Sequence, residues 1–316
     1  MGLAWTEGGT AMSFEPDAIL DRRRLRRNLS LWRIAAIVGI TGAVAIIAAS
    51  MSGLTFGRNH ISKLEISGVI VEDEERDQAI LDLADDAHAK ALIVTIDSPG
   101  GTTSGSEGLY LALREVARKK PVVAVMGTVA ASGGYVTAIG ADHIIARGNT
   151  ITGSIGVLMQ NTEVSELLKK IGVGIEMITS GPLKGKPSPF EPMDAQGRAA
   201  IKTLIDDSYR WFVDLVAERR NLTPERAREL SDGRVYSGRL ALEAKLIDQI
   251  GGMPEARAWL EKEKDISGEL PVEPLVYGDD ATLSGRLINN MIFGWAEKSL
   301  NLKRLTLDGL VSLWQP

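Results

Sequence analysis

Two continuous apolar runs constrain the fold of this chain more than any other feature of its sequence. Ala91–Ile96 reads ALIVTI and Pro121–Val125 reads PVVAV, so neither run alternates apolar with polar side chains. Short runs of this kind, rich in β-branched residues, are typical of strands that are buried on both faces of a sheet. We therefore expect a sheet with helices packed on both sides.

Segments with helical spacing separate the predicted strands. Strands are also predicted at Lys63–Val71, His143–Ala146 and Gly174–Ile178, and helices at Glu74–Lys90, Ser106–Lys119, Ser132–Gly140, Glu163–Ile171, Ala195–Arg220 and from Thr223 onward. Strands that alternate with helices predict an α/β layered fold with a mostly parallel sheet. In such sheets, sites form at the carboxyl ends of the strands.

An uncharged segment precedes this pattern. Ile34–Gly57 contains no charged residue and follows six arginines between Arg22 and Arg33. About 20 apolar residues suffice to cross a bilayer core, and the positive-inside rule places the basic arm, residues 1–33, in the cytoplasm. We expect one transmembrane anchor over residues 34–57 and an exported domain after Arg58. A cleaved signal peptide and a buried helix of a soluble domain are the alternatives.

Composition excludes several classes of site. The chain of 316 residues has no cysteine, which excludes disulfides, a thiolate nucleophile and zinc–thiolate or iron–sulfur sites. Its three histidines, His60, His88 and His143, are scattered, so a histidine-rich metal site is not expected. A net charge of −5 without a basic stripe beyond the N-terminal arm argues against a nucleic-acid partner. We expect no metal and no organic cofactor.

Two glycine-rich segments follow the two apolar runs. Asp97–Gly101 (DSPGG) is either a tight turn or a place where the amides of Gly100 and Gly101 face a ligand. Ser132 lies in the second segment, at a predicted strand-to-helix turn, and is followed by Gly133. It is either a helix N-cap or a nucleophile whose oxyanion is bound by amides of Gly133 and of Gly100 or Gly101.

A third segment, Ser180–Phe190 (SGPLKGKPSPF), supplies a candidate base. A serine hydroxyl attacks only when a neighbouring group removes its proton. A lysine can do so where burial keeps its amine neutral. Lys184 lies in a segment bounded by Gly and Pro that is compatible with partial burial, although a solvated loop lysine is the alternative. Lys186 is its rival for the role of base.

Together these segments resemble the signal peptide peptidase A (protease IV) family, serine peptidase family S49, which has a Clp/crotonase-like fold. Three stretches carry the resemblance, in order and spacing: Gly127–Val157, Ser180–Phe190 and Gly233–Gly252. It implies a nucleophilic Ser132, a general base Lys184 and a lysine-orienting Ser154. It also implies an oxyanion hole from Gly133 and the turn with Gly100 and Gly101.

The resemblance further implies a function and partners. The family degrades signal peptides left in the bacterial inner membrane, with the catalytic domain on the outer face, and it forms homo-oligomeric rings whose sites neighbouring subunits can complete. We thus expect a peptidase domain over residues 60–265, then a linker and an amphipathic tail over 266–316. A pseudoprotease scaffold and a crotonase-type acyl-CoA enzyme are the other function classes. No histidine occupies the place near Val157 that a Ser–His relative would use, and His143 is expected to be structural.

Overall fold

The computed structural model describes residues 31–42, 58–278 and 311–313. The chain divides into two compact units, Met1–Arg58 and Asn59–Pro316. In the first unit, residues 31–42 form a helix. Within the described ranges, no helix is both long and apolar enough to cross a membrane. Of the anchor expected over residues 34–57, the part from 43 to 57 lies outside the described residues.

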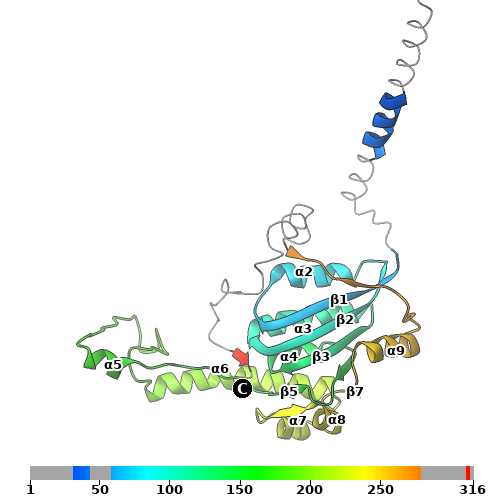
Figure 1. The fold of residues 1–316 in the computed structure, drawn as a ribbon. Helices are drawn as coiled ribbons and strands as arrows, with labels where there is room; N and C mark the ends of the chain where they lie inside the picture. The colour runs from blue at the N-terminus through cyan, green and yellow to red at the C-terminus, as the bar shows by residue number, and fades with distance from the viewer. Residues whose placement is uncertain (1–30, 43–57, 279–310, 314–316) are drawn as a thin grey trace, which may run out of the picture. The chain divides into compact units, whose positions relative to one another are not determined.

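The second unit is built on one mostly parallel sheet (Figure 1). Its strands in the described ranges are β1 (His60–Ile70), β2 (Ala89–Thr102), β3 (Val122–Ala131), β4 (His143–Ala146), β5 (Ile151–Gly153), β6 (Val235–Ser237), β7 (Gln249–Ile250), β8 (Val272–Pro274) and β9 (Val311–Leu313). The central order is β6-β5-β3-β2-β1-β8, with β4 between β3 and β7 and with β9 beside β2. Among the strands that the structure describes, only the β5–β6 and β2–β9 pairs are antiparallel. The α/β class with a mainly parallel sheet is confirmed, and the Clp/crotonase-like fold remains an expectation from the resemblance.

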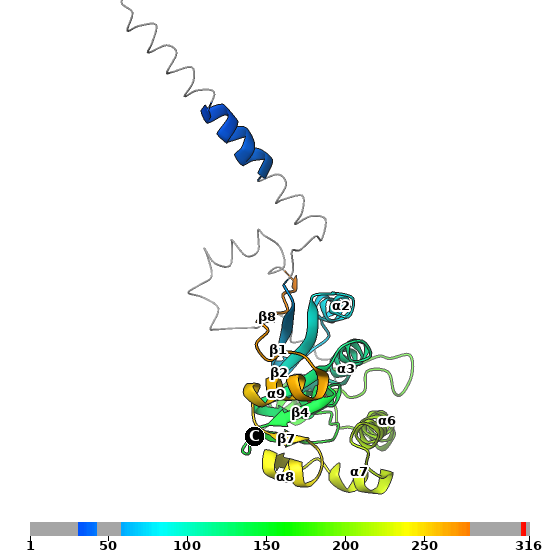
Figure 2. The ribbon, with the colours of Figure 1, turned by 90° about the vertical axis from the view of Figure 1, so that its right-hand side faces the viewer.

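Helices cover both faces of this sheet (Figure 2). They are α2 (Glu74–Leu83), α3 (Thr103–Ala117), α4 (Gly133–Ile139), α5 (Ser165–Lys170), α6 (Ala195–Arg219), α7 (Pro224–Leu230), α8 (Gly238–Glu243) and α9 (Met253–Lys264). Leu92 and Val94 of β2 lie in the larger core, which also contains side chains of α2, α3, α4 and α6. Ala91 and Ile93 lie in a smaller core with Leu260 of α9. Alternate residues of one strand thus enter two cores, which explains why the run contains no polar face.

Some predicted elements differ from the structure. Gly174–Ile178 is not a strand, because it pairs with no described strand and its residues are exposed. The helix predicted over Glu74–Lys90 ends at Leu83, since the Asp86 carboxylate accepts from the His88 amide and forms a turn there. Part of the expected linker forms β8, which pairs with β1. In the expected amphipathic tail, residues 311–313 form β9, and residues 279–310 and 314–316 lie outside the described residues.

Residues 157–194, here called the arm, leave the sheet after β5 and return through α6. Figure 1 shows α5 and the loop around it extended away from the sheet. The two ends of α6 are about 37 Å apart, at 1.5 Å per residue. Its last turn contacts the end of α4, because Arg219 donates hydrogen bonds to the carbonyls of Ile139 and Ala141. The arm ends at Asp194, the N-cap of α6, at the opposite end of this helix.

Candidate active site

Ser132 occupies a sharp turn between β3 and α4. Its backbone has φ 55° and ψ −117°, a combination that residues other than glycine rarely adopt. The Ser132 amide donates to the Gly153 carbonyl at 2.8 Å, and its carbonyl accepts from the Tyr135 and Val136 amides at 2.9 Å each. The side chain makes no helix-capping hydrogen bond. The turn therefore presents Ser132 in a strained conformation of the kind found at nucleophiles, and the N-cap alternative loses its support.

The backbone around Gly133, next to Ser132, packs closely on the turn that contains Gly101, and this turn packs on the end of β1 at Ile70. A methyl group placed on Gly133 would lie 3.1 Å from the Gly101 nitrogen and 2.3 Å from the Ser106 hydroxyl oxygen. One on Gly101 would overlap the Ile70 carbonyl, at 1.7 Å. Glycines at both positions thus let the turn after Asp97 pack directly on the first turn of α4. The two amides expected to bind an oxyanion, those of Gly101 and Gly133, are brought together.

The amide of Gly100, an expected oxyanion donor, is already hydrogen-bonded within the turn. The φ of 112° at Gly100 requires glycine, and the amide donates to the Ser98 hydroxyl oxygen at 3.1 Å. An amide that is engaged within the turn is not open to a ligand. Gly101 and Gly133 therefore remain the candidate oxyanion donors, and Gly100 shapes the turn.

Ser154 lies next to the same turn. It follows Gly153, whose carbonyl accepts from Ser132, and its own amide donates to the Arg234 carbonyl at 2.8 Å. Ser154 has φ 49°, so its backbone also takes the left-handed conformation. Together with Tyr209 of α6 it lines a cavity of about 440 Å³. The structure thus places Ser154 beside Ser132, at the edge of a space large enough for a side chain from elsewhere.

Lys184 is not part of this cluster. It lies in the arm and is exposed, which differs from the partial burial expected from the sequence. Within the described ranges its amine makes no hydrogen bond and no ion pair. The neighbouring Lys186 packs against Gly197 in the first turn of α6, at 3.6 Å from the position of a Gly197 Cβ. Lys184 is therefore near the end of α6 opposite to the one that contacts α4, and one chain does not assemble the expected dyad.

Lys186 is already paired. Its amine donates to the Glu191 carboxylate at 2.6 Å and lies 3.5 Å from the Asp194 carboxylate. The hydrogen bond to Glu191 raises the pKa of the Lys186 amine above its usual value. A base must be neutral to accept a proton, and these contacts favour the charged form. The structure therefore gives Lys186 a structural role in the arm.

His143 lies beside the start of β3, at the opposite end of that strand from Ser132. It pairs with Val123 in β3, nine residues before Ser132 along the chain. Its ring stacks on Trp259 with centroids 4.7 Å apart, and its Nε2 lies 3.1 Å from the Gln249 side-chain oxygen. These contacts support the expected structural role.

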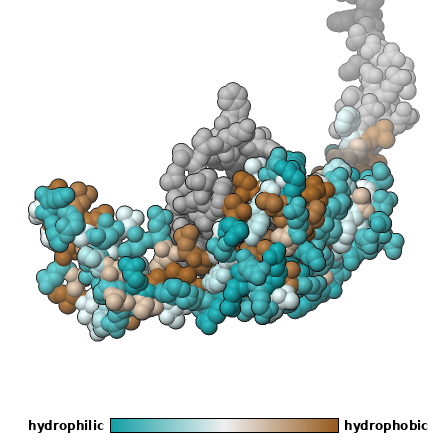
Figure 3. Space-filling view, turned by 90° about the horizontal axis from the view of Figure 1, so that it is seen from below, coloured by the Kyte–Doolittle hydropathy of each residue, from teal (hydrophilic) through white to brown (hydrophobic). Residues whose placement is uncertain are grey.

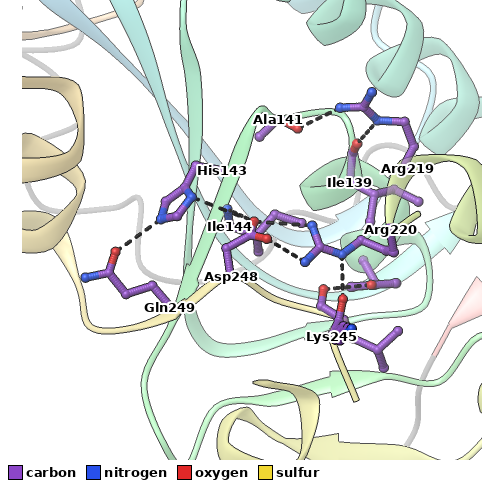
Figure 4. Close-up of polar contacts among 11 residues, drawn as sticks. Ile139, Ala141, His143, Ile144, Arg219, Arg220, Lys245, Asp248 and Gln249 are labelled. Carbon is purple, nitrogen blue, oxygen red and sulfur yellow. Dashed lines mark hydrogen bonds and ion pairs between the residues drawn. The ribbon is translucent and has the colours of Figure 1, made fainter. Parts of the chain in front are cut away.

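Figure 4 shows the ion pair beside His143, between Arg220 and Asp248, with a shortest N–O distance of 2.6 Å. Arg220 also donates to the Lys245 carbonyl. These contacts join the end of α6 to the segments around β7. They lie with His143, away from the turn at Ser132.

The short strand β9 pairs with the same part of β2 that forms the glycine turn. Its register places Leu313 opposite Gly100 and Val311 opposite Thr102, antiparallel to β2. After Ser98, β3 no longer pairs with β2, and β9 pairs with β2 there instead. An extended peptide can therefore add to the sheet beside Gly101.

Sequence reasoning missed two side chains that hold this region. The Asp97 carboxylate accepts from the Val129 amide at 3.0 Å and so ties β2 to the segment before Ser132. The Ser106 hydroxyl donates to the Thr102 carbonyl at 2.9 Å and packs on Gly133. Asp97 follows a buried strand directly, which is a usable signal. Ser106 resembles any serine near a helix N-terminus, so the sequence offered no signal for it.

Comparison with known proteins gives a consistent result. The model of peptidase family S49 matches residues 114–267. A Synechocystis protein named as a protease is 40% identical over 208 residues, which cover 65% of this chain and 74% of that protein. An Enterococcus faecium protein named as signal peptide peptidase SppA is 32% identical over 270 residues, 81% of this chain and 76% of its own. Protease 4 of Haemophilus influenzae is 34% identical over 63% of this chain, and this match covers 34% of that protease.

Proposed function

Because the chain belongs to peptidase family S49, we propose that it is a serine endopeptidase in which Ser132 is the nucleophile and Lys184 the general base. The observation that carries the proposal is the strained backbone of Ser132 beside the amides of Gly101 and Gly133. A nucleophile needs donors close by, because the negative charge of the tetrahedral intermediate develops next to it.

The chemistry proceeds in two steps. The neutral Lys184 amine takes the proton of the Ser132 hydroxyl, and the oxygen attacks the peptide carbonyl. The protonated amine then gives its proton to the leaving amine, and water hydrolyses the acyl-enzyme by the same route in reverse. The amides of Gly101 and Gly133 bind the oxyanion in both steps, and Ser154 orients the Lys184 amine.

A second copy of the chain supplies the missing base. The arm exposes an unusual set of large apolar side chains: Leu167, Ile171, Val173, Ile175, Met177, Ile178, Leu183 and Phe190. Figure 3 shows apolar surface between hydrophilic areas at the end of the peptidase unit that the arm forms. Exposed apolar residues concentrated in one segment are typical of an interface. Contact with a neighbour removes Lys184 from water and so favours the neutral amine that a base must have.

The substrates we propose are cleaved signal peptides and other apolar peptides. One matched relative is named a signal peptide peptidase. The uncharged segment 34–57 would hold the enzyme at the inner membrane, with the peptidase unit on the outer face. The edge of β2 beside Gly101, which pairs with β9 in this structure, would bind the peptide as an antiparallel strand in place of β9.

Co-expression of two inactive variants tests this proposal. The full-length Ser132→Ala and Lys184→Ala proteins, each with its own tag, are purified as mixed oligomers and tested on an apolar peptide. Each variant alone should be inactive. With random assembly, about one quarter of the sites in the mixture should combine an intact Ser132 with an intact Lys184 from a neighbour. Lys186→Ala, the matched control, should keep its activity.

Two results would contradict the proposal. Turnover by Ser132→Ala alone would exclude Ser132 as the nucleophile. An inactive mixture, with mixed oligomers demonstrated by their two tags, would exclude a base supplied by the neighbour.

A further inference from the structure

Ser98 lies where β2 changes its pairing on both sides. Along β1 the partners shift between Ser67, opposite Asp97, and Val69, opposite Gly100. Along β3 they shift between Ile96 and Ser98 of β2. The β1 ladder therefore skips Ser98 and Pro99, and the β3 ladder skips Asp97, while Ser98 still pairs with Ala130 of β3 and Gly100 with Val69 of β1. A further interaction can hold the backbone at this interruption.

The Ser98 hydroxyl supplies this interaction. It donates to the Gly68 carbonyl at 2.6 Å and accepts from the Gly100 amide at 3.1 Å. The Ser98 residue is fully buried, at 0% exposure. A hydroxyl has one proton to donate, so the contact with Gly68 fixes its orientation and directs a lone pair at the Gly100 amide. One side chain thus connects β1 to the glycine turn and holds Gly100 at its φ of 112°.

The turn that Ser98 holds lies directly against the nucleophile's helix. A methyl group on Gly134 would be 2.8 Å from the Ser98 carbonyl oxygen, and one on Gly133 would be 3.1 Å from the Gly101 nitrogen. Displacement of the turn would therefore move the Gly101 amide relative to Gly133 and Ser132. Donors to an oxyanion act only when their geometry matches the transition state.

We propose that Ser98 is a positioning residue for the peptidase reaction, whose hydroxyl holds the Gly100–Gly101 turn so that the Gly101 amide faces the oxyanion. This inference rests on the proposed function of Ser132. Ser98 itself touches neither the substrate nor the reacting atoms. Its loss should therefore weaken binding of the transition state while leaving binding of the substrate nearly unchanged.

Steady-state kinetics of the full-length enzyme test the proposal. In Ser98→Ala, kcat should fall about 10-fold or more while KM changes less than about 3-fold. The affinity for a peptide aldehyde, whose hemiacetal resembles the tetrahedral intermediate, should fall by the same factor as kcat/KM. Ser98→Cys keeps the size of the side chain and a weaker hydrogen-bonding group, so its kcat should lie between those of Ser98→Ala and the wild type.

Thr95→Val is the matched control. The Thr95 hydroxyl donates to the Leu64 carbonyl at 3.3 Å, a similar bond between β2 and β1, three residues before Ser98. The Thr95→Val substitution should lower the unfolding temperature about as much as Ser98→Ala does, and it should leave kcat unchanged.

Equal kcat values in Ser98→Ala and Thr95→Val, or a loss confined to KM, would overturn the role of Ser98. If Ser98→Ala does not fold, a folded Ser98→Cys with wild-type kcat and aldehyde affinity would overturn it as well. Wild-type turnover that survives Ser132→Ala would instead overturn the proposed function.

Discussion

Adding one methyl group at Gly133 should separate folding from catalysis. The new Cβ of Gly133→Ala would lie 2.3 Å from the Ser106 hydroxyl oxygen, 3.1 Å from the Gly101 nitrogen and 3.3 Å from the Gly100 Cα. The first distance is about 1 Å shorter than an ordinary contact, so Ser106 must move, and overpacking of this kind costs about 1–3 kcal/mol. Alanine regains up to about 1 kcal/mol of that through helix propensity. The variant should be about 1–2 kcal/mol less stable.

Its activity should fall much further. The same methyl group presses on the glycine turn, and loss of one oxyanion donor typically lowers kcat about 10²–10³-fold. Ser106→Ala removes the oxygen that the methyl group meets, at the cost of about 1 kcal/mol for its bond to Thr102. The double variant should therefore show a favourable coupling in urea unfolding, but its kcat should stay as low as that of Gly133→Ala. Recovery of kcat in the double variant would refute the reasoning, because the methyl group would then act through Ser106 and not on the amides.

Three further predictions concern residues around the site. His143→Ala should lower stability by about 1 kcal/mol through loss of its stacking on Trp259, yet leave kcat unchanged; a collapse of kcat in the folded variant would indicate a Ser–His enzyme. Burial raises the pKa of Tyr135 above its usual 10.0, so the unfolded chain loses this proton first and stability should fall as pH rises above about 10. Urea midpoints measured against pH should fall less steeply in Tyr135→Phe, and an unchanged slope would contradict this assignment. Ending the chain at residue 310 removes β9 from the edge of β2 and should speed fluorophosphonate labelling of Ser132; slower labelling would show that β9 supports the site.

The central part of the fold could be predicted because its signal is local. The ALIVTI and PVVAV runs need no partner information to be identified as doubly buried strands, and they form the first halves of β2 and β3. The convergence of Ser132 and Gly101 followed, since the carboxyl ends of neighbouring parallel strands meet at one edge. β6, β7 and β8 have only two or three residues each, too few to show a periodicity.

The exposure of the arm could not be predicted, because its apolar residues are of the same types as those of a buried core. Gly174–Ile178 (GIEMI) carries the apolar residues of a strand, but Ile178 is 93% exposed. A sequence pattern shows which residues are apolar, but it does not show whether their own chain or another chain covers them. The expected partial burial of Lys184 is absent within one chain for the same reason. Ser98 was visible only as part of a glycine-rich turn, because its hydroxyl bonds to Gly68, which lies thirty positions away in the sequence, as well as to Gly100.

Covalent labelling of the full-length protein tests the central claim most directly. A fluorophosphonate reacts with a serine that is activated as a nucleophile, and mass spectrometry of the digested protein identifies the residue that carries the label. We predict a single labelled peptide that contains Ser132, with labelling slowed strongly in Lys184→Ala and not in Lys186→Ala. A label on another residue, or labelling of Ser132 at the wild-type rate in Lys184→Ala, would contradict the assignment of nucleophile and base.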